Sequence, residues 1–214
     1  MSTTHLLLQY GSEPWAVRFT DLENRLAFTV YVPLTCASIF RWDPVLKYVS
    51  SYPGLRYFTD NSQFTTTALN QSSQVEELPN LLLKLVREAP WAQQHPDIMG
   101  PVSSFFYFGP SRTPGNLAYG NTSTHPMAND IRPSKRDSNT RYFLTQSGKE
   151  YKWKVSPTRY ECYDHKNVQV AVWEVVQGGE SFNARLTLKQ AALPVVTEIV
   201  TTLTLNRISQ VLNW

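Results

Sequence analysis

Hydrophobic and polar positions alternate with a period of two along much of the second half of the chain. The clearest run is 150–155, where Tyr151, Trp153 and Val155 alternate with three charged residues. Because successive side chains of a β-strand point to opposite faces, this run predicts a strand with one buried face and one wet face. Similar runs, separated by turn residues, predict an antiparallel meander with strands at 141–145, 150–155, 159–163, 168–176 and 181–188. Gly178 and Gly179 predict a tight hairpin before the last strand.

The first half has shorter runs of the same kind and one run with helical spacing. The alternating runs predict strands at 6–10, 16–20, 25–32, 37–42 and 103–108. From Pro79 to Ala89, apolar residues recur at helical spacing with polar residues opposite, and Pro90 follows. This spacing predicts an amphipathic helix.

The segment from Leu193 to Leu212 meets the criteria of both a strand and a helix. Its many β-branched residues favour a strand. Its length without a turn signal, and Pro194 near its start, favour a helix. We predict a helix that is apolar nearly all round and is therefore buried by the sheet. Glu198 and Arg207 within it argue against a transmembrane segment.

Length and composition favour one domain. A chain of 214 residues can bury a core without disulfides or metals, and its 42% hydrophobic and 17% charged residues exclude a disordered chain. Residues 109–140 are rich in Pro, Gly, Ser, Thr and Asn, which predicts a long loop. We predict a single domain over residues 1–214, with a long insertion and loop at about 43–140.

Two segments of the chain carry distinctive motifs: residues 143–154 read Phe-Leu-Thr-Gln-Ser-Gly-Lys-Glu-Tyr-Lys-Trp-Lys, and residues 195–202 read Val-Val-Thr-Glu-Ile-Val-Thr-Thr. Both segments resemble the signatures of an uncharacterised family of fungal proteins. The resemblance extends over about residues 141–205, is weaker over 17–42 and is absent between these regions. The family is similar to the tubby C-terminal, plant LURP-one and phospholipid-scramblase domains.

The resemblance implies a mainly β (α+β) fold. In such domains a closed antiparallel β-barrel of tubby C-terminal-like type surrounds a buried hydrophobic C-terminal helix, and here the amphipathic helix at 79–89 would be an addition within the insertion. Neither the phosphoinositide-binding motif of tubby proteins nor the calcium site of scramblases matches this sequence. The resemblance therefore implies the fold rather than the function.

Cysteine usage and the N-terminal sequence bear on the compartment. Cys36 and Cys162 stand alone, without the spacing of a disulfide framework or a zinc site. The first residues lack the basic and apolar regions of a signal peptide. These features predict an intracellular protein with free thiols, in the cytoplasm, at a membrane surface or in the nucleus.

Positive charge is concentrated in one stretch of the chain. The net charge is +3, and residues 132–166 alone contain nine basic and four acidic residues. The wet face of the strand at 150–155 and its neighbours offer a candidate site for an anion or lipid headgroup, formed by Lys149, Lys152, Lys154 and Arg159. Lysines at alternate positions also keep an exposed strand face in solution, and this alternative stays open.

No catalytic motif is present in the sequence. It has no Gly-x-Ser-x-Gly, Walker, Gly-x-Gly-x-x-Gly or His-Glu-x-x-His motif, and its four histidines are scattered. We therefore predict no catalytic residues, no metal site and no cofactor. The predicted function is a non-enzymatic binding module, with anionic membrane lipid or another protein as its partner; the total charge is too low to favour nucleic acid.

Two other functions remain open. An enzyme could assemble its site from the 43–140 insertion. A barrel could also hold a small apolar ligand between aromatic side chains, for which the candidates are Tyr151, Trp153, Tyr160, Trp173 and Phe182.

Overall fold

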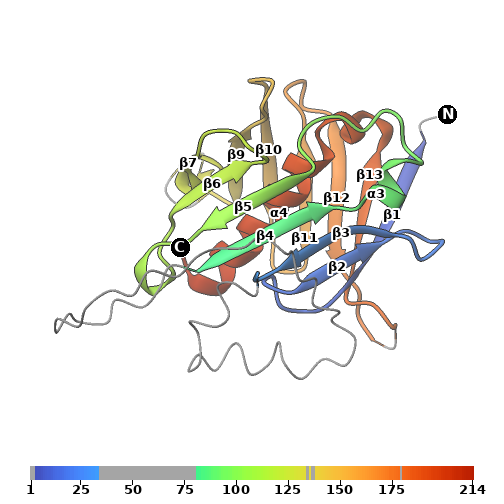
Figure 1. Cartoon of the computed structure of the whole chain (residues 1–214), viewed down its shortest axis with the longest axis horizontal. Helices are drawn as coiled ribbons and strands as arrows, with labels where there is room; N and C mark the ends of the chain where they lie inside the picture. Colours follow the sequence, from blue (N-terminus) through green and yellow to red (C-terminus); the bar gives the residue numbers. More distant parts are fainter. Residues whose placement is uncertain (1–2, 34–80, 134, 136–137, 179) are drawn as a thin grey trace, which may run out of the picture.

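The computed structural model describes residues 3–33, 81–133, 135, 138–178 and 180–214 (Figure 1). These residues form one antiparallel sheet of 13 strands and a long C-terminal helix, α4 (Val196–Leu212). The mainly β class, the antiparallel sheet and the C-terminal helix are thus confirmed.

The sheet consists of two meanders that join side by side. The first comprises β1 (Thr4–Tyr10), β2 (Val17–Thr20), β3 (Leu26–Tyr31), β4 (Leu82–Arg87), β5 (Ser103–Tyr107), β6 (Asn116–Tyr119) and β7 (His125–Pro126). The second comprises β8 (Arg132–Pro133), β9 (Thr140–Leu144), β10 (Glu150–Val155), β11 (Arg159–Tyr163), β12 (Gln169–Val175) and β13 (Ala184–Lys189). Strand β1 pairs with β13 and joins the two meanders, whereas β7 and β8 form the two free edges. The sheet is therefore open between β7 and β8.

Helix α4 lies inside the curve of this sheet (Figure 1). Its residues from 196 to 206 are all buried. On one side the Trp153 indole of β10 donates a hydrogen bond of 2.9 Å to Thr202, and on the other Ser104 of β5 bonds Thr201 at 2.8 Å. Because β5 and β10 belong to different meanders, the sheet covers the helix from both sides.

The threonines of α4 explain why its sequence also suits a strand. The hydroxyl of Thr202 donates to the carbonyl of Glu198 at 2.8 Å, and that of Thr204 donates to Val200 at 2.9 Å. Each hydroxyl is thereby satisfied within the helix, so the β-branched residues are buried without an unpaired polar group. Pro194 lies in the preceding 3-10 turn, η3 (Gln190–Val195).

Strands β10 and β11 have the predicted bounds, but the end of the second meander differs from the prediction. Strand β13 begins at Ala184, and beyond β12 the Val176 N–H donates to the Asn183 carbonyl at 3.0 Å. The connection between the two strands is therefore longer than the tight hairpin predicted at Gly178 and Gly179, of which Gly179 lies outside the described residues. The predicted strand at 37–42 and Cys36 lie outside the described residues.

The predicted amphipathic helix at Pro79–Ala89 was also wrong. Residues 82–87 form strand β4, in which Leu83 and Leu85 are buried while Lys84 points outward, and only the four residues of α3 (Ala89–Ala92) are helical. A leucine-rich run satisfies a period of two as well as a helical period. Pairing with β3 and β5 decides in favour of the strand.

The segment predicted as a long loop, 109–140, contains several short elements. These are η1 (Pro110–Arg112), β6, β7, η2 (Met127–Asn129) and β8. The region predicted as an insertion thus supplies strands β4 to β8 of the same sheet.

An ion pair holds the chain where the sheet is open. His125 Nε2 of β7 lies 2.6 Å from a carboxylate oxygen of Asp130, which belongs to the segment between β7 and β8 and is almost fully buried. The hydrogen bond with Asp130 raises the pKa of His125 above its ordinary value of 6.5, although burial opposes this shift. The imidazole also stacks on Tyr119, with ring centroids 5.9 Å apart.

This ion pair predicts a dependence of stability on pH. Because the pKa of His125 is higher in the folded state, its contribution is complete below pH 6.5 and is lost as the pH rises through the folded pKa. We expect a loss of about 1 kcal/mol or less, since the imidazole is partly exposed. Urea unfolding of the wild type and of His125→Gln between pH 6 and 8 measures it as their difference. Equal pH slopes for the two proteins would contradict this assignment.

Candidate functional site

The predicted lysines lie along the outer face of β10 and in the turn that precedes it. Lys152 and Lys154 flank the ring of Tyr163 on β11, with their Nζ atoms 5.8 and 4.7 Å from its centroid. Lys149 is exposed in the β9–β10 turn. In the part of the chain that the structure describes, none of the three lysines forms an ion pair.

Arg159, the fourth predicted residue, is neutralised by its neighbours. Its guanidinium donates to Glu161 at 3.0 Å and to Glu174 at 2.8 Å. The hydrogen bond from Arg159 lowers the pKa of Glu161. Arg159, Glu161 and Lys154 line a shallow hollow of about 160 Å³. The structure thus brings Lys154 and Arg159 together, but Arg159 adds no free positive charge.

Two turns at one end of the sheet carry exposed aliphatic side chains, which the sequence analysis did not single out. Leu144, before the β9–β10 turn, is 55% exposed, and Val168, after the β11–β12 turn, is 50% exposed. Because β10 pairs with both β9 and β11, the two turns are neighbours, and they project together in Figure 1. The carboxylate of Asp164 holds the second turn by accepting the N–H groups of Lys166 and Val168.

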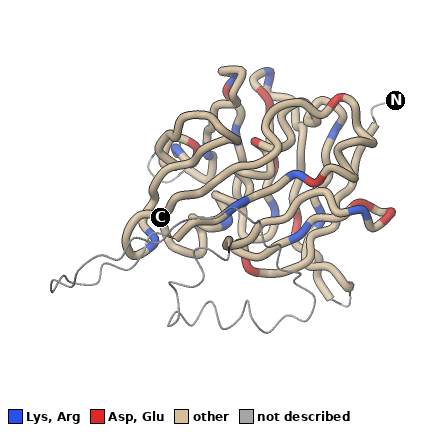
Figure 2. The backbone as a smooth tube through the Cα atoms, in the orientation of Figure 1, with Lys and Arg blue, Asp and Glu red and all other residues tan. Residues whose placement is uncertain are grey.

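Basic residues accompany these aliphatic side chains. Figure 2 shows a basic residue beside an acidic one on each projecting turn. The acidic Glu150 is paired with Arg132 at 2.9 Å, which leaves Lys149 as an unpaired charge.

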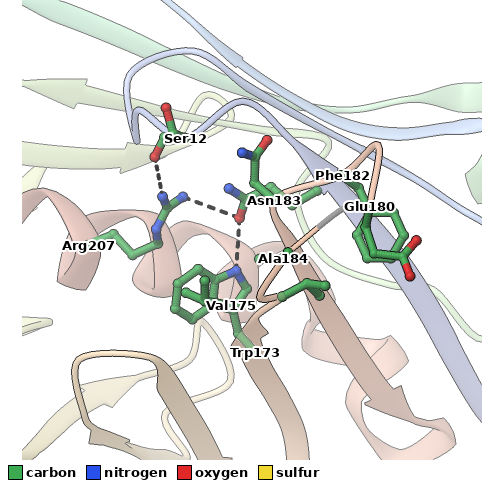
Figure 3. Close-up of a pocket in the computed structure, with 11 residues that line it drawn as sticks. Ser12, Trp173, Val175, Glu180, Phe182, Asn183, Ala184 and Arg207 are labelled. Carbon is green, nitrogen blue, oxygen red and sulfur yellow. Dashed lines mark hydrogen bonds between the residues drawn. The ribbon is translucent and has the colours of Figure 1, made fainter.

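A second site is a pocket of about 290 Å³ between the end of β1, the β12–β13 connection and α4 (Figure 3). Gln9, which is 1% exposed, organises its inner wall. The Gln9 side-chain oxygen accepts from the Trp173 indole at 2.8 Å and from Arg207 Nη1 at 3.3 Å. Its amide nitrogen donates to the Gly11 carbonyl at 2.8 Å, so its orientation is determined.

Arg207 projects from α4 into this wall. Its Cζ lies 5.0 Å from the centroid of the Trp173 ring, and its Nη2 donates to the Ser12 carbonyl at 2.6 Å. Burial lowers the pKa of Arg207 to about 10. Sequence reasoning considered Arg207 only as evidence against a membrane span. The signal that could have revealed a site is a lone cation in a helix expected to be buried, because such a charge needs a partner.

A separate group of polar side chains is enclosed at the N-terminal end of α4. Glu198 is 2% exposed, and burial raises its pKa. Arg87 from β4 attracts it and donates to Thr197 Oγ1 at 3.0 Å and to the Met99 carbonyl at 2.8 Å. Arg87 Nε, one oxygen of Glu198 and the Tyr119 hydroxyl have no hydrogen-bond partner among the described residues.

The aromatic candidates for an apolar-ligand site are divided between the core and the Arg207 pocket, which Trp173 also lines. Trp153 and Tyr160 are fully buried in the core that surrounds α4, whereas Phe182 lines the Arg207 pocket. Burial raises the pKa of the Cys162 thiol well above its ordinary value. Among the described ranges, no three His, Cys, Asp or Glu side chains are grouped so as to hold a metal ion.

Comparison with known proteins finds one family model that matches part of the chain. Residues 104–207, from β5 to near the end of α4, match the model of a family of unknown function, DUF6593. This match includes both segments, 143–154 and 195–202, that resemble an uncharacterised family. The relation to tubby, LURP-one and scramblase domains stays a prediction. Neither a curated protein nor a solved structure matches the chain. No helix in the described ranges has the length and apolar character needed to cross a membrane.

Proposed function

We propose that the protein is a non-enzymatic binding module that docks on the surface of membranes containing anionic lipids. The docking face comprises Leu144, Lys149, Lys152, Lys154 and Val168. The observation that carries the proposal is the coincidence, at one end of the sheet, of Lys149 and Lys152 with two exposed aliphatic side chains. Lys154 continues this row of lysines along β10, opposite Glu161. Cationic and aliphatic side chains on neighbouring turns suit an interface between anionic headgroups and acyl chains.

The lysines would contribute unequally. A basic residue near an anionic surface contributes about 1 kcal/mol, and this contribution falls off over roughly 10 Å. Because a strand rises about 3.3 Å per residue, Lys149 lies nearest to a membrane that contacts the turns, followed by Lys152 and then Lys154. The aliphatic contacts of Leu144 and Val168 would add a component that salt does not screen.

We also propose that the sheet is an open relative of the tubby-like barrels, in keeping with the nearly cyclic order of its strands around α4. An intracellular location at a membrane surface agrees with the buried, unbridged thiol of Cys162. The resemblance of residues 143–154 to the family signature supports the proposed relation to the tubby-like barrels.

Co-sedimentation with liposomes tests the docking proposal. We expect the full chain to bind vesicles of phosphatidylcholine with phosphatidylserine more tightly than vesicles of phosphatidylcholine alone, and less tightly at higher salt. Changing Lys149, Lys152 and Lys154 together to Ser should weaken binding to the anionic vesicles by about 10- to 100-fold at low salt, from about 1 kcal/mol for Lys149 and less for the two lysines farther from the membrane. The single changes should decrease in effect in that order.

A matched control removes the same charge elsewhere. Arg18, Lys84 and Arg185 lie on strands β2, β4 and β13, toward the end of the sheet opposite to the two turns, and the first two also lie over aromatic rings. Changing these three to Ser should leave most of the binding intact. An equal loss of vesicle binding in both triple variants would show that binding depends only on net charge and would contradict a specific docking face. The absence of vesicle binding by the wild type would also reject the proposal.

A further inference from the structure

The pocket beside Arg207 contains a cation that is attracted by the more distant Glu13 but forms no ion pair with a described carboxylate. Of the five N–H donors of a guanidinium, Arg207 uses one on the Gln9 amide oxygen and one on the Ser12 carbonyl, both neutral acceptors. In the described part of the chain, no carboxylate lies within ion-pair distance of Arg207. A cation that is largely withdrawn from water attracts an anion more strongly than an exposed one does.

A second donor faces the same pocket. The side-chain oxygen of Asn183 accepts from the Gly11 N–H at 2.9 Å, which directs the amide, and its nitrogen has no hydrogen-bond partner among the described residues. Asn183 is in turn fixed by its backbone N–H, which donates to the Gln9 carbonyl at 2.8 Å. Arg207 and Asn183 are thus both held by groups of the protein while keeping donors available.

The rest of the lining limits the kind of anion. Phe182 and Val175 provide apolar surface, and Glu180 lies across the pocket from Arg207 with its carboxylate pointing away (Figure 3). A nearby carboxylate disfavours an anion of more than one charge, such as a phosphate dianion. A planar guanidinium fork matches a planar carboxylate, which can accept two parallel hydrogen bonds.

We propose that this pocket binds a small organic monocarboxylate, whose carboxylate contacts Arg207 and Asn183 and whose carbon skeleton lies against Phe182 and Val175. The pocket is distinct from the docking face, and its ligand is independent of membrane binding. Trp173 acts as the support that positions Arg207 and Gln9.

Sodium benzoate is a suitable probe, with benzamide as its neutral counterpart of nearly equal shape. We expect the indole N–H resonance of Trp173, assigned with Trp173→Phe, to shift on titration of the full-length protein with benzoate. The affinity for benzamide should be at least about tenfold lower than that for benzoate, because benzamide lacks the negative charge that Arg207 attracts. Phenyl phosphate, which carries a second charge, should also bind more weakly than benzoate.

Variants distinguish a binding role of Arg207 from a purely structural one. Arg207→Lys keeps the charge but loses the fork, so benzoate affinity should fall about tenfold. Asn183→Asp keeps the oxygen that accepts from the Gly11 N–H and adds a negative charge that repels benzoate, so benzoate affinity should fall. This variant tests the site even if the Arg207→Lys variant does not fold. Arg185→Gln removes a cation from the outer face of β13 and should change affinity less than twofold.

Three results would overturn the proposal. They are no shift of the Trp173 resonance at roughly 10 mM benzoate, equal binding of benzoate and benzamide, and unchanged affinity in a folded Asn183→Asp variant.

Discussion

Replacing Trp153 by alanine is expected to lower the free energy of unfolding by about 3–5 kcal/mol. The indole is fully buried between β10 and α4, and its removal leaves a cavity in the centre of the core. It also removes the hydrogen bond from Nε1 to Thr202, a direct polar link between the second meander and the helix. Urea unfolding at fixed pH measures the loss.

The hydrogen bond can be separated from the packing. A double-mutant cycle of Trp153→Phe and Thr202→Val should give a coupling energy of about 1 kcal/mol. Tyr107→Ala serves as the control, because Tyr107 is a large aromatic residue that is 41% exposed, and its loss should cost about 0.5 kcal/mol or less. A cost for Trp153→Ala as small as that for Tyr107→Ala would show that α4 is not packed as described.

Replacing Arg87 by methionine is expected to cost about 3–5 kcal/mol at neutral pH. Arg87 attracts the enclosed carboxylate of Glu198 and satisfies Thr197 and the Met99 carbonyl. Without it, Glu198 must remain charged in a dry environment or take up a proton. Adding Glu198→Gln to Arg87→Met should restore part of the lost stability, because the charge is then absent.

The same pair predicts a slope of stability with pH. Burial raises the folded pKa of Glu198 above its ordinary value of 4.5, so its contribution is complete below pH 4.5 and is lost as the pH rises through the folded pKa. Arg87→Met should make the free energy of unfolding fall more steeply with rising pH. Glu198→Gln should abolish this pH dependence both in the wild type and in the Arg87→Met variant. Urea unfolding between pH 4.5 and 8 in steps provides the test. An unchanged slope in Glu198→Gln would assign the pH dependence to other groups, of which His125 is the first candidate.

The fold of the second meander could be predicted from the sequence because its strands alternate cleanly. Tyr151 and Trp153 of β10 and Leu186 and Leu188 of β13 all lie inside, as their period indicates. Strand β4 could not be predicted in this way, because Leu83 and Leu85 belong to a run that fits both periods and only the pairing with β3 and β5 selects one.

The candidate sites also differ in whether they depend on local sequence or on strand pairing. Lys149, Lys152 and Lys154 are local in sequence, so the pattern located them. The neutralisation of Arg159 depends on the register that sets it opposite Glu174, and strand periodicity does not determine register. The Arg207 pocket could not be predicted from the sequence, because Gln9, Asn183 and Arg207 come together only through the pairing of β1 with β13.

The pairing of β1 with β13 also affects how the protein can fold. Most neighbouring strands within each meander are close in sequence, although β3 ends at Tyr31 and its partner β4 begins at Leu82. The β1–β13 ladder joins strands from opposite ends of the described chain, and closing so long a loop slows folding. Helix α4, which both meanders cover, follows all of the strands in sequence. During synthesis from the N-terminus, the strands therefore emerge before the helix that fills their concave face. Until α4 is made, the apolar faces of both meanders remain exposed to aggregation, and a chaperone would be most useful in that interval.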